Sequence, residues 1–307
     1  MRLVFAMWEK MRTFATEKQE RLTGMNILCI SRSLRFSPNL AGEDAAIFTA
    51  VVDELRAMSH RVTTLREEKM TEMDFAPFDR VMTMARDIPS LVMLEQMMDT
   101  ETQRKFINNI GGMLACTNKA KVAALMMEEG VPQPEFVAGK QDEVLFCSPG
   151  AKEGINIPAW LKNCDGSATK AEDTLFCDKP KPYRDAKKLF RKMGVETWLL
   201  QEHRVGDLVK FYGVEGTDFF HWQYASMRHS KFGLEKINGR PRGYDFDVQH
   251  VKHYADKLAS RMGVPVYGGD VIISLGGKLH FIDFNDFPSF SSCRDMAAKA
   301  IAKRITQ

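Results

Sequence analysis

The sequence has few cysteines and no long apolar run, and its charges nearly cancel. Six cysteines stand apart among 307 residues without a paired metal spacing, which argues against a zinc site or a disulfide scaffold. They suit free thiols in a reducing cytosol. No apolar stretch is long enough to span a bilayer. The formal charge of +3, from 43 basic and 40 acidic residues, gives no reason to expect a nucleic-acid or membrane partner. We therefore expect a cytoplasmic protein.

The glycine-rich fingerprint of dinucleotide-binding proteins is also missing. Ser31–Phe36 stands after the first predicted strand, where a Gly-x-Gly-x-x-Gly turn would be. Residues 1–24 are rich in charged side chains, and we expect an extension that is poorly ordered or not native. From residue 25 to 112, strands and helices alternate, which predicts a small parallel sheet wound with helices. The expected strands are 26–30, 61–65 and 78–84, and the expected helices are 44–58 and 88–98.

The alternating pattern breaks near residue 106, and a different unit opens. A helix over 118–129, capped by Thr117 or Asn118, ends at Gly130 with Pro132 just beyond. Further strands are expected over 159–163, 174–177, 198–203, 208–214 and 219–225, and further helices over 183–193, 247–262 and 294–305. This mixture predicts an α+β fold for the remainder of the chain.

The most informative segment lies near the end of the chain and has the pattern of a two-stranded hairpin. Val266–Ser274 and Lys278–Phe284 are strand-like, and a Gly-Gly pair between them suits a tight turn. Pairing of the strands makes Asp270 and Asp283 neighbours, and Asp283 and Asn285 project from one face. Three such oxygen ligands suit Mg²⁺, with Mn²⁺ as a second candidate, together with nucleotide phosphates. The alternative is an ordinary solvated strand end.

Three lysines lie at sequence positions that suit ligands of a phosphate group. Lys162 lies in a strand followed by Gly166-Ser167-Ala168, and small residues let backbone N–H groups approach phosphate closely. Lys210 lies inside an apolar strand, where an unpaired ammonium is costly. Lys119 lies directly after the helix cap. The alternatives are a surface turn for the small-residue loop and a solvated helix start for Lys119.

The segment Gln201-Glu202-His203 joins a buried strand to a turn at Gly206. Its backbone edge offers groups of the kind that read adenine, and Asp207 offers an acceptor for ribose hydroxyls. The alternative is a plain hairpin with a solvated Asp207.

Taken in order, these segments resemble the ATP-grasp superfamily, including the glutathione synthetase type of ATP-binding domain and the ribosomal-protein modification ligases. The matching pieces are Asn118-Lys119, Gly130–Pro134, Leu161-Lys162, Asp165–Ala168, Gln201–His203, Gly206-Asp207, Lys210, Asp270 and Ile282–Asn285. The resemblance covers roughly residues 25–307. It implies that two α+β lobes, 113–203 and 204–307, enclose ATP, and that a small Rossmann-like α/β domain over 25–112 precedes them. It also implies a monomer or a homodimer.

The resemblance further implies a role for each site residue. Lys119 and Lys162 contact the phosphates beneath the Gly166-Ser167-Ala168 loop, Gln201, Glu202 and His203 meet adenine, Asp207 holds ribose, and Asp270, Asp283 and Asn285 hold the metal. Where many relatives have Glu at the second metal position, this chain has Asp283, which is one methylene shorter.

Two kinds of reaction fit the resemblance. Most ATP-grasp enzymes phosphorylate a carboxylate and let an amine attack it, so our main prediction is a carboxylate–amine ligase with a small-molecule or peptide substrate. Arg228 and Lys210 are its expected catalytic cations, because a planar guanidinium suits oxyanions. The alternative for Arg228 is a mobile basic loop.

The second kind of reaction is that of a small-molecule kinase. Leu208–Val214 and Ile282–Pro288 resemble segments of inositol polyphosphate kinases, but this chain has Thr169–Glu172 where those kinases carry a substrate-handling His. Their polyanionic substrates also need a basic cleft, for which the candidates are Arg32, Arg35, Arg228, His229 and Lys231. A third alternative is a protein that senses ATP without turnover.

Overall fold

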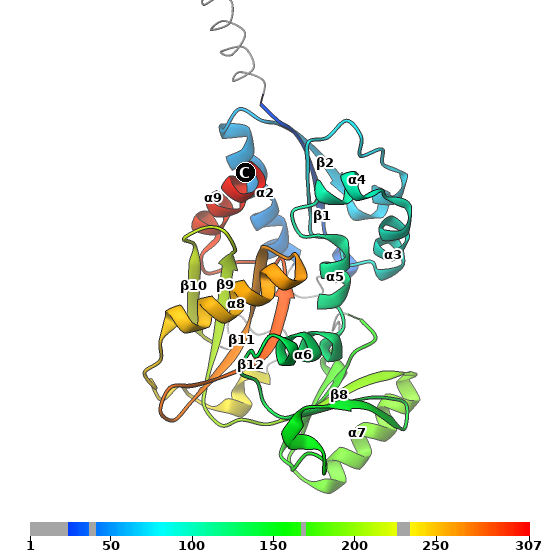
Figure 1. Cartoon of the computed structure of the whole chain (residues 1–307), viewed down its shortest axis with the longest axis vertical. Coiled ribbons are helices and arrows are strands. Elements are labelled where there is room, and N and C mark those ends of the chain that lie inside the picture. The colour runs from blue at the N-terminus through cyan, green and yellow to red at the C-terminus, as the bar shows by residue number, and fades with distance from the viewer. Residues whose placement is uncertain (1–23, 37–40, 167–169, 226–233) are drawn as a thin grey trace, which may run out of the picture.

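The computed structural model describes residues 24–36, 41–166, 170–225 and 234–307 (Figure 1). The predicted extension therefore lies outside the described residues, apart from its last residue, and so do Ser167, Ala168 and Arg228. The described part contains three β-sheets with helices packed on their faces. None of its helices combines the length and the apolar character that crossing a membrane requires.

The first sheet consists of three parallel strands in the order β2-β1-β3. They are β1 (Asn26–Ser31), β2 (Arg61–Arg66) and β3 (Arg80–Thr83). The prediction of a parallel sheet in this part of the chain is confirmed. Because parallel strands end at the same edge of a sheet, the loops that follow β1 and β3 meet at one edge.

Four helices belong to this first unit. They are α2 (Ala41–Ala57), α3 (Ile88–Met97), α4 (Thr100–Arg104) and α5 (Ile110–Cys116). Side chains alternate along β1, so Ile27 and Cys29 face a core with α2, while Leu28 and Ile30 face a core with α3 and α5. The first of these cores also contains helix α9 (Arg294–Ile305), which packs along α2 (Figure 1). The last helix of the chain thus completes the core of the first unit.

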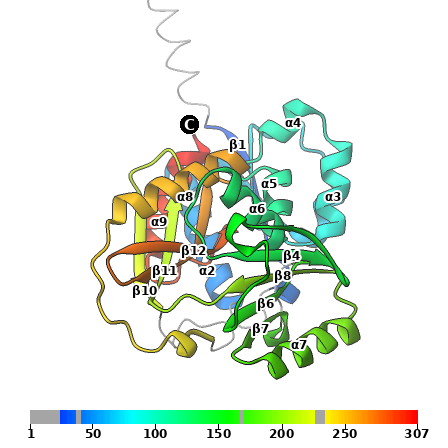
Figure 2. The same cartoon turned by 60° about the horizontal axis from the view of Figure 1, so that its bottom comes forward.

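The second sheet has five antiparallel strands in the order β5-β4-β8-β6-β7. They are β4 (Phe136–Lys140), β5 (Glu143–Cys147), β6 (Ala159–Asn163), β7 (Thr174–Cys177) and β8 (Thr197–Glu202). Helix α6 (Lys119–Glu128) covers one face and α7 (Pro180–Met193) the other (Figures 1 and 2). Asn118 is the N-cap of α6, and its side chain accepts from the backbone N–H of Lys121.

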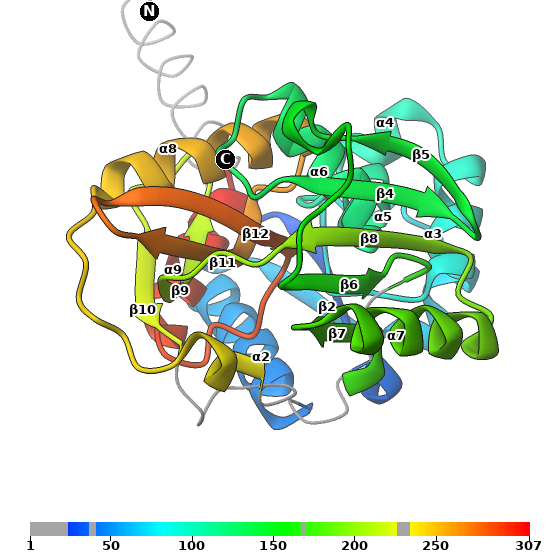
Figure 3. The ribbon, with the colours of Figure 1, turned by 90° about the horizontal axis from the view of Figure 1, so that it is seen from below.

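The third sheet has four antiparallel strands in the order β10-β9-β11-β12. They are β9 (Asp207–Val214), β10 (Phe220–Tyr224), β11 (Val266–Ser274) and β12 (Lys278–Asp286). Helix α8 (Val248–Met262) covers one face, while α9 and α2 lie against the other (Figure 3). The predicted hairpin is confirmed as β11–β12, and Asp270 lies opposite Asp283 in its register.

The connection between β8 and β9 passes from the second sheet to the third. Strand β8 pairs with β4 and β6, whereas β9 pairs with β10 and β11. The alternative of a plain hairpin around Gly206 is therefore wrong, because residues 203–206 link two sheets. The three sheets fall within the three predicted units, and the unit boundaries themselves stay a prediction. Short 3₁₀ helices lie at Leu34–Phe36, Glu67–Glu72, Pro149–Ala151, Ala171–Asp173 and Leu234–Asn238.

Candidate active site

A cavity of about 380 Å³ lies between the second and third sheets, and loops of the first unit close one side of it. Nine of the predicted site residues line this cavity: Lys119, Lys162, Gln201, Glu202, His203, Lys210, Asp270, Asp283 and Asn285. They come from α6, from β6 and the end of β8, and from three strands of the third sheet. The fold thus brings together side chains that are up to 166 positions apart in the sequence.

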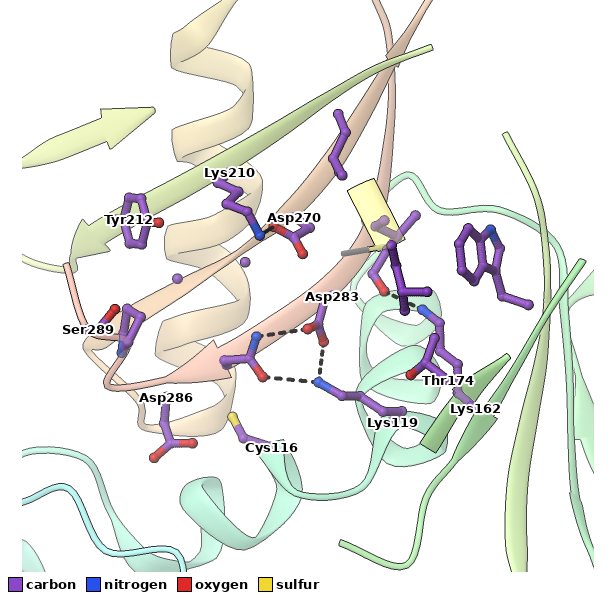
Figure 4. Close-up of a pocket in the computed structure, with 18 of the residues that line it drawn as sticks. Cys116, Lys119, Lys162, Thr174, Lys210, Tyr212, Asp270, Asp283, Asp286 and Ser289 are labelled. Atoms are coloured by element: carbon purple, nitrogen blue, oxygen red, sulfur yellow. Dashed lines mark hydrogen bonds and ion pairs between the residues drawn. The ribbon is translucent and has the colours of Figure 1, made fainter. Parts of the chain in front are cut away.

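The predicted metal ligands of β12 form one hydrogen-bonded cluster with a lysine. Asp283 and Asn285 project from the same face, and the amide of Asn285 donates to Asp283 Oδ2 over 2.8 Å. The ammonium of Lys119, at the first turn of α6, donates to Asp283 Oδ1 and, over 3.0 Å, to Asn285 Oδ1 (Figure 4). The ammonium of Lys119 therefore occupies a position between two predicted metal ligands, where a positive charge is stabilised.

Electrostatics keep Asp283 ionised in this cluster. Burial alone raises the pKa of its carboxyl, but the charges of Lys119 and Lys162 outweigh burial and lower the pKa to about 2. A carboxylate that stays charged at neutral pH inside the fold is available to a metal ion or to a basic group.

Lys162 bridges the two lobes from the middle of β6. Its ammonium is buried and donates to Gln201 Oε1 over 2.7 Å and to the carbonyl oxygen of Ile282 over 2.9 Å. Burial lowers the pKa of Lys162 to about 8, although nearby Asp283 opposes the shift. An anion placed against this ammonium would favour its charged form and raise its pKa again.

A second lysine–carboxylate pair lies across neighbouring strands. Lys210 of β9 is opposite Asp270 of β11, and the two groups are 3.5 Å apart. Asp270 is in turn opposite Asp283 of β12, so these three side chains form a row across the sheet.

The donor set fits a metal ion that arrives with a nucleotide. Within the described residues no group of three His, Cys, Asp or Glu side chains could hold a metal ion by itself. Asp270, Asp283 and Asn285 supply two carboxylates and one amide oxygen. Mg²⁺ binds in this way in proteins, through one or two carboxylates plus substrate phosphates and water, and without an all-protein cage.

The other end of the cavity is aromatic. Trp160 and His203 line it, and the indole N–H of Trp160 donates to His203 Nδ1 over 3.1 Å. The Phe176 ring lies 4.9 Å from Trp160 and 5.2 Å from His203 between centroids. Burial lowers the pKa of His203, which keeps the ring neutral. A flat, apolar base is the kind of group that such a wall accommodates.

Asp207, by contrast, does not line the cavity, and its oxygens already have partners. It is buried at the start of β9, and its carboxylate accepts from the backbone N–H groups of Arg242, Gly243 and Tyr244 over 2.6–2.9 Å. These bonds hold the segment before α8 against the sheet. The expected contact between Asp207 and a ribose is therefore not supported by its position.

Gly166 also lies apart from the residues that line the cavity. Ser167, Ala168 and Arg228 lie outside the described residues, so the expected phosphate loop and the expected catalytic arginine stay predictions.

Four further charged residues line the cavity where it meets the first unit. Arg32, after β1, binds Asp44 over 2.9 Å and the carbonyl oxygen of Phe287 over the same distance. Arg86, after β3, binds the carboxylate of Asp286 and, over 2.7 Å, its carbonyl oxygen. Sequence reasoning did not identify Arg86 or Asp286 as site residues. The signal that marks Arg32 and Arg86 is their position at the carboxyl ends of parallel strands.

No protein-family model matches the sequence, and no curated protein sequence matches it either. Solved structures do match. The RimK domain ATP-grasp protein of Sphaerobacter thermophilus DSM 20745 is 13% identical with a TM-score of 0.61, over 92% of this chain and 100% of its own.

Two ligases match to a similar degree. D-alanine–D-alanine ligase of Bacillus anthracis, in complex with ATP, is 11% identical with a TM-score of 0.62, over 92% of this chain and 96% of its own. D-alanyl-alanine synthetase A of Vibrio cholerae O1 biovar eltor is 12% identical with a TM-score of 0.63, over 92% and 98%. All three agree on the architecture: the chain has the ATP-grasp fold, preceded by a small α/β unit.

Proposed function

From an ATP-grasp fold with its lysines and carboxylates in one cavity, we propose that this protein is an ATP-dependent ligase that joins a carboxylate to an amine. The observation that carries the proposal is the convergence of Lys119, Lys162 and Lys210 with Asp270 and Asp283 in that cavity. Two of the solved structures that share the fold are a D-alanine–D-alanine ligase and a D-alanyl-alanine synthetase.

The nucleotide has a definite place in this proposal. Its base lies at the aromatic end beside Trp160 and His203, where the backbone of Gln201–His203 offers hydrogen-bonding groups. Its phosphates lie at the charged end against Lys119 and Lys162. Asp270, Asp283 and Asn285 would hold the magnesium ion, which would neutralise part of the negative charge of the phosphates.

The reaction needs positioning and charge more than a protein nucleophile. A carboxylate oxygen of the acceptor attacks the γ-phosphorus, the bond to the bridging oxygen breaks, and ADP leaves. The amine nitrogen then attacks the acyl carbon and loses a proton, and phosphate leaves as the amide forms. Lys119, Lys162 and Lys210 stabilise the negative charge that develops, and Arg228 stays the expected cation for the acyl oxygen.

The wall contributed by the first unit supports a carboxylate–amine acceptor over a polyphosphorylated one. Arg32 is neutralised by Asp44, and Arg86 by Asp286 of β12, so among the described residues this side of the cavity carries two positive and two negative charges. Arg35 is exposed and pairs with Asp87, and the other candidates for a basic cleft, Arg228, His229 and Lys231, lie outside the described residues. A polyanion favours an excess of positive charge, whereas a substrate that carries both a carboxylate and an ammonium matches a balanced wall.

The test follows ADP release from Mg-ATP with pools of amino acids, dipeptides and phosphorylated polyols. Wild type is compared with Asp283→Ala and with Asp295→Asn, an exposed carboxylate on α9 that serves as the control. Turnover with amino acids or dipeptides that Asp283→Ala abolishes and Asp295→Asn retains is the expected result. Turnover with polyols alone identifies a kinase, binding of Mg-ATP without turnover identifies a sensor, and no binding of Mg-ATP overturns the proposal.

A further inference from the structure

Helix α7 and the residues that flank it carry a large excess of positive charge. Between Lys179 and Gly194 there are seven Lys or Arg residues and one acidic residue, a net charge of +6, whereas the entire chain carries only +3. All other residues together therefore carry −3. A solvated helix face usually mixes both signs in similar numbers, whereas this helix carries a single acidic residue, the exposed Asp185, among its basic ones.

Most of these charges are exposed and have no carboxylate partner among the described residues. Arg191 pairs with Asp142, and Lys187 lies over the Trp198 ring, 4.3 Å from its centroid. The other basic side chains of the helix and its N-cap are exposed and form no ion pair in the described part of the chain: Lys179, Lys181, Arg184, Lys188 and Lys192. The exposed positive surface formed by these five residues is called the α7 basic face below.

The physics of an isolated helix disfavours this arrangement. Lys179 is the N-cap and Lys181 lies in the first turn, where the helix dipole favours acidic side chains. Lys188 has like-charged neighbours at Arg184 and Lys192, four positions away on each side, and like-charged pairs at this spacing destabilise a helix. Ala186 and Phe190 on the opposite face hold the helix on the sheet. Packing on the sheet thus offsets the repulsion between the charges of the α7 basic face, and binding of a negatively charged partner would explain why they are concentrated there.

The location of the α7 basic face leaves the cavity free. Leu161 and Trp198 of the second sheet pack beneath α7, whereas Lys162, the next residue along β6, points to the cavity side. Figures 1 and 2 show α7 on the outer side of this sheet, away from α6. A partner bound there does not compete with a nucleotide.

The chemistry of the α7 basic face favours carboxylates over nucleic acid or lipid. Its only aromatic residues, Tyr183 and Phe190, are half-buried and buried, so no ring on the basic face can stack on bases. None of the large exposed apolar side chains of the described residues lies on α7 itself, so the helix carries no side chain that would insert into a membrane. The helix is about 21 Å long, which an extended segment of about six residues spans.

We propose that the α7 basic face docks an acidic segment of a protein partner, rich in Asp and Glu. The proposal does not depend on the nucleotide site and is tested without nucleotide. The probe is a fluorescein-labelled peptide of ten glutamates, and its fluorescence anisotropy is measured against the full-length protein at low and at moderate salt.

The test variant is Lys181→Glu/Lys188→Glu/Lys192→Glu, and the control is Lys69→Glu/Lys299→Glu/Lys303→Glu, which changes the net charge equally at exposed positions elsewhere. We expect the test variant to weaken binding by about tenfold or more and the control to change it by about twofold at most. A Gln version of the test variant shows whether loss of charge suffices. Equal loss in both triple variants overturns the proposal, and so does tighter binding of a charge-matched DNA duplex or of phosphatidylserine vesicles than of the peptide.

Discussion

Lys119 and Asp283 lie 164 positions apart in the chain and form an ion pair across the cavity. The same ammonium contacts Asn285, so a single lysine of α6 ties together the two oxygen-bearing side chains of β12. The pair couples α6, which packs on the second sheet, to the β11–β12 hairpin of the third sheet. Substitution of either residue should therefore weaken nucleotide binding.

Lys119→Met is expected to weaken Mg-ATP binding by about ten- to a hundredfold. A charge-assisted hydrogen bond to a phosphate contributes about 1.5–3 kcal/mol, and Met retains the aliphatic length without the charge. Titration calorimetry measures the affinity. Lys121→Met, an exposed residue two positions along the same helix, is the control and should bind as wild type does. Equal affinities for Lys119→Met and wild type would remove Lys119 from the phosphate site.

Asp283→Asn is expected to lower the affinity of the nucleotide-bound protein for its metal ion by at least about tenfold. The amide retains the shape but not the charge, and hard cations prefer carboxylate oxygens. Mn²⁺ binding, followed by electron paramagnetic resonance in the presence of a non-hydrolysable ATP analogue, checks this without turnover. A variant that binds Mn²⁺ as tightly as wild type would place the metal elsewhere.

ATP binding should become weaker, and should take up a proton, as the pH rises above 8. Burial lowers the pKa of Lys162 from 10.5 to about 8, so the group is largely neutral above that pH, and phosphate favours its charged form. The unfolded chain keeps this proton up to about pH 10.5, so this group's effect is to make the nucleotide-free protein more stable as the pH rises from 8 to 10.5.

Calorimetry at pH 8.5 in two buffers of different ionisation enthalpy measures the proton uptake, which should be about three-quarters of a proton for a pKa of about 8. Lys162→Arg, whose guanidinium stays charged at this pH, should show none. Uptake that persists in this variant would assign the proton to another group.

Arg86→Met is expected to destabilise the protein by about 3–5 kcal/mol. It removes one partner of a buried ion pair and leaves Asp286, which has no exposed surface, without its counter-charge. Arg35→Met breaks an exposed pair with Asp87 and should cost at most about 1 kcal/mol. Urea denaturation gives both values, and similar losses for the two variants would contradict the structural distinction.

Asp207→Ala should lower stability by about 2 kcal/mol or more while leaving ATP affinity unchanged. The substitution leaves three backbone N–H groups without their acceptor, and none of them lines the cavity. Thermal unfolding and calorimetric ATP titration separate the two effects. A selective loss of ATP affinity in a variant as stable as wild type would return Asp207 to the ribose site.

Local patterns predicted the parts of the site that lie close together in sequence. The Gly-Gly turn and the two apolar strands around it fix the β11–β12 register, so the proximity of Asp270 and Asp283 follows from the sequence. Lys210 was marked because an ammonium in an apolar strand needs an anion, and the structure provides Asp270.

Contacts between residues far apart in the sequence have no local sequence pattern that predicts them. Arg86 and Asp286 are 200 positions apart, and nothing in either neighbourhood indicates the other. Strand β4 was missed because Gly139 interrupts its apolar run. Strand β5 was missed because Val144 and Leu145 are both exposed on this edge strand, so its sequence does not alternate between buried and exposed side chains. The partners of Asp207 were missed because they lie in a loop 35 to 37 positions away.

The packing of α9 against α2 has a consequence for the order of events during synthesis. The core around β1 and α2 includes Ala297, Ile301 and Ile305, so α2 depends for its packing on a helix that is synthesised much later. A ribosome-bound chain in which α9 has not yet emerged exposes the apolar stripe of α2 to solvent. Contacts of such large sequence separation also slow folding, because a long loop must close before they form. A chaperone that shields α2 during this interval would act on a surface that the nascent chain cannot yet cover by itself.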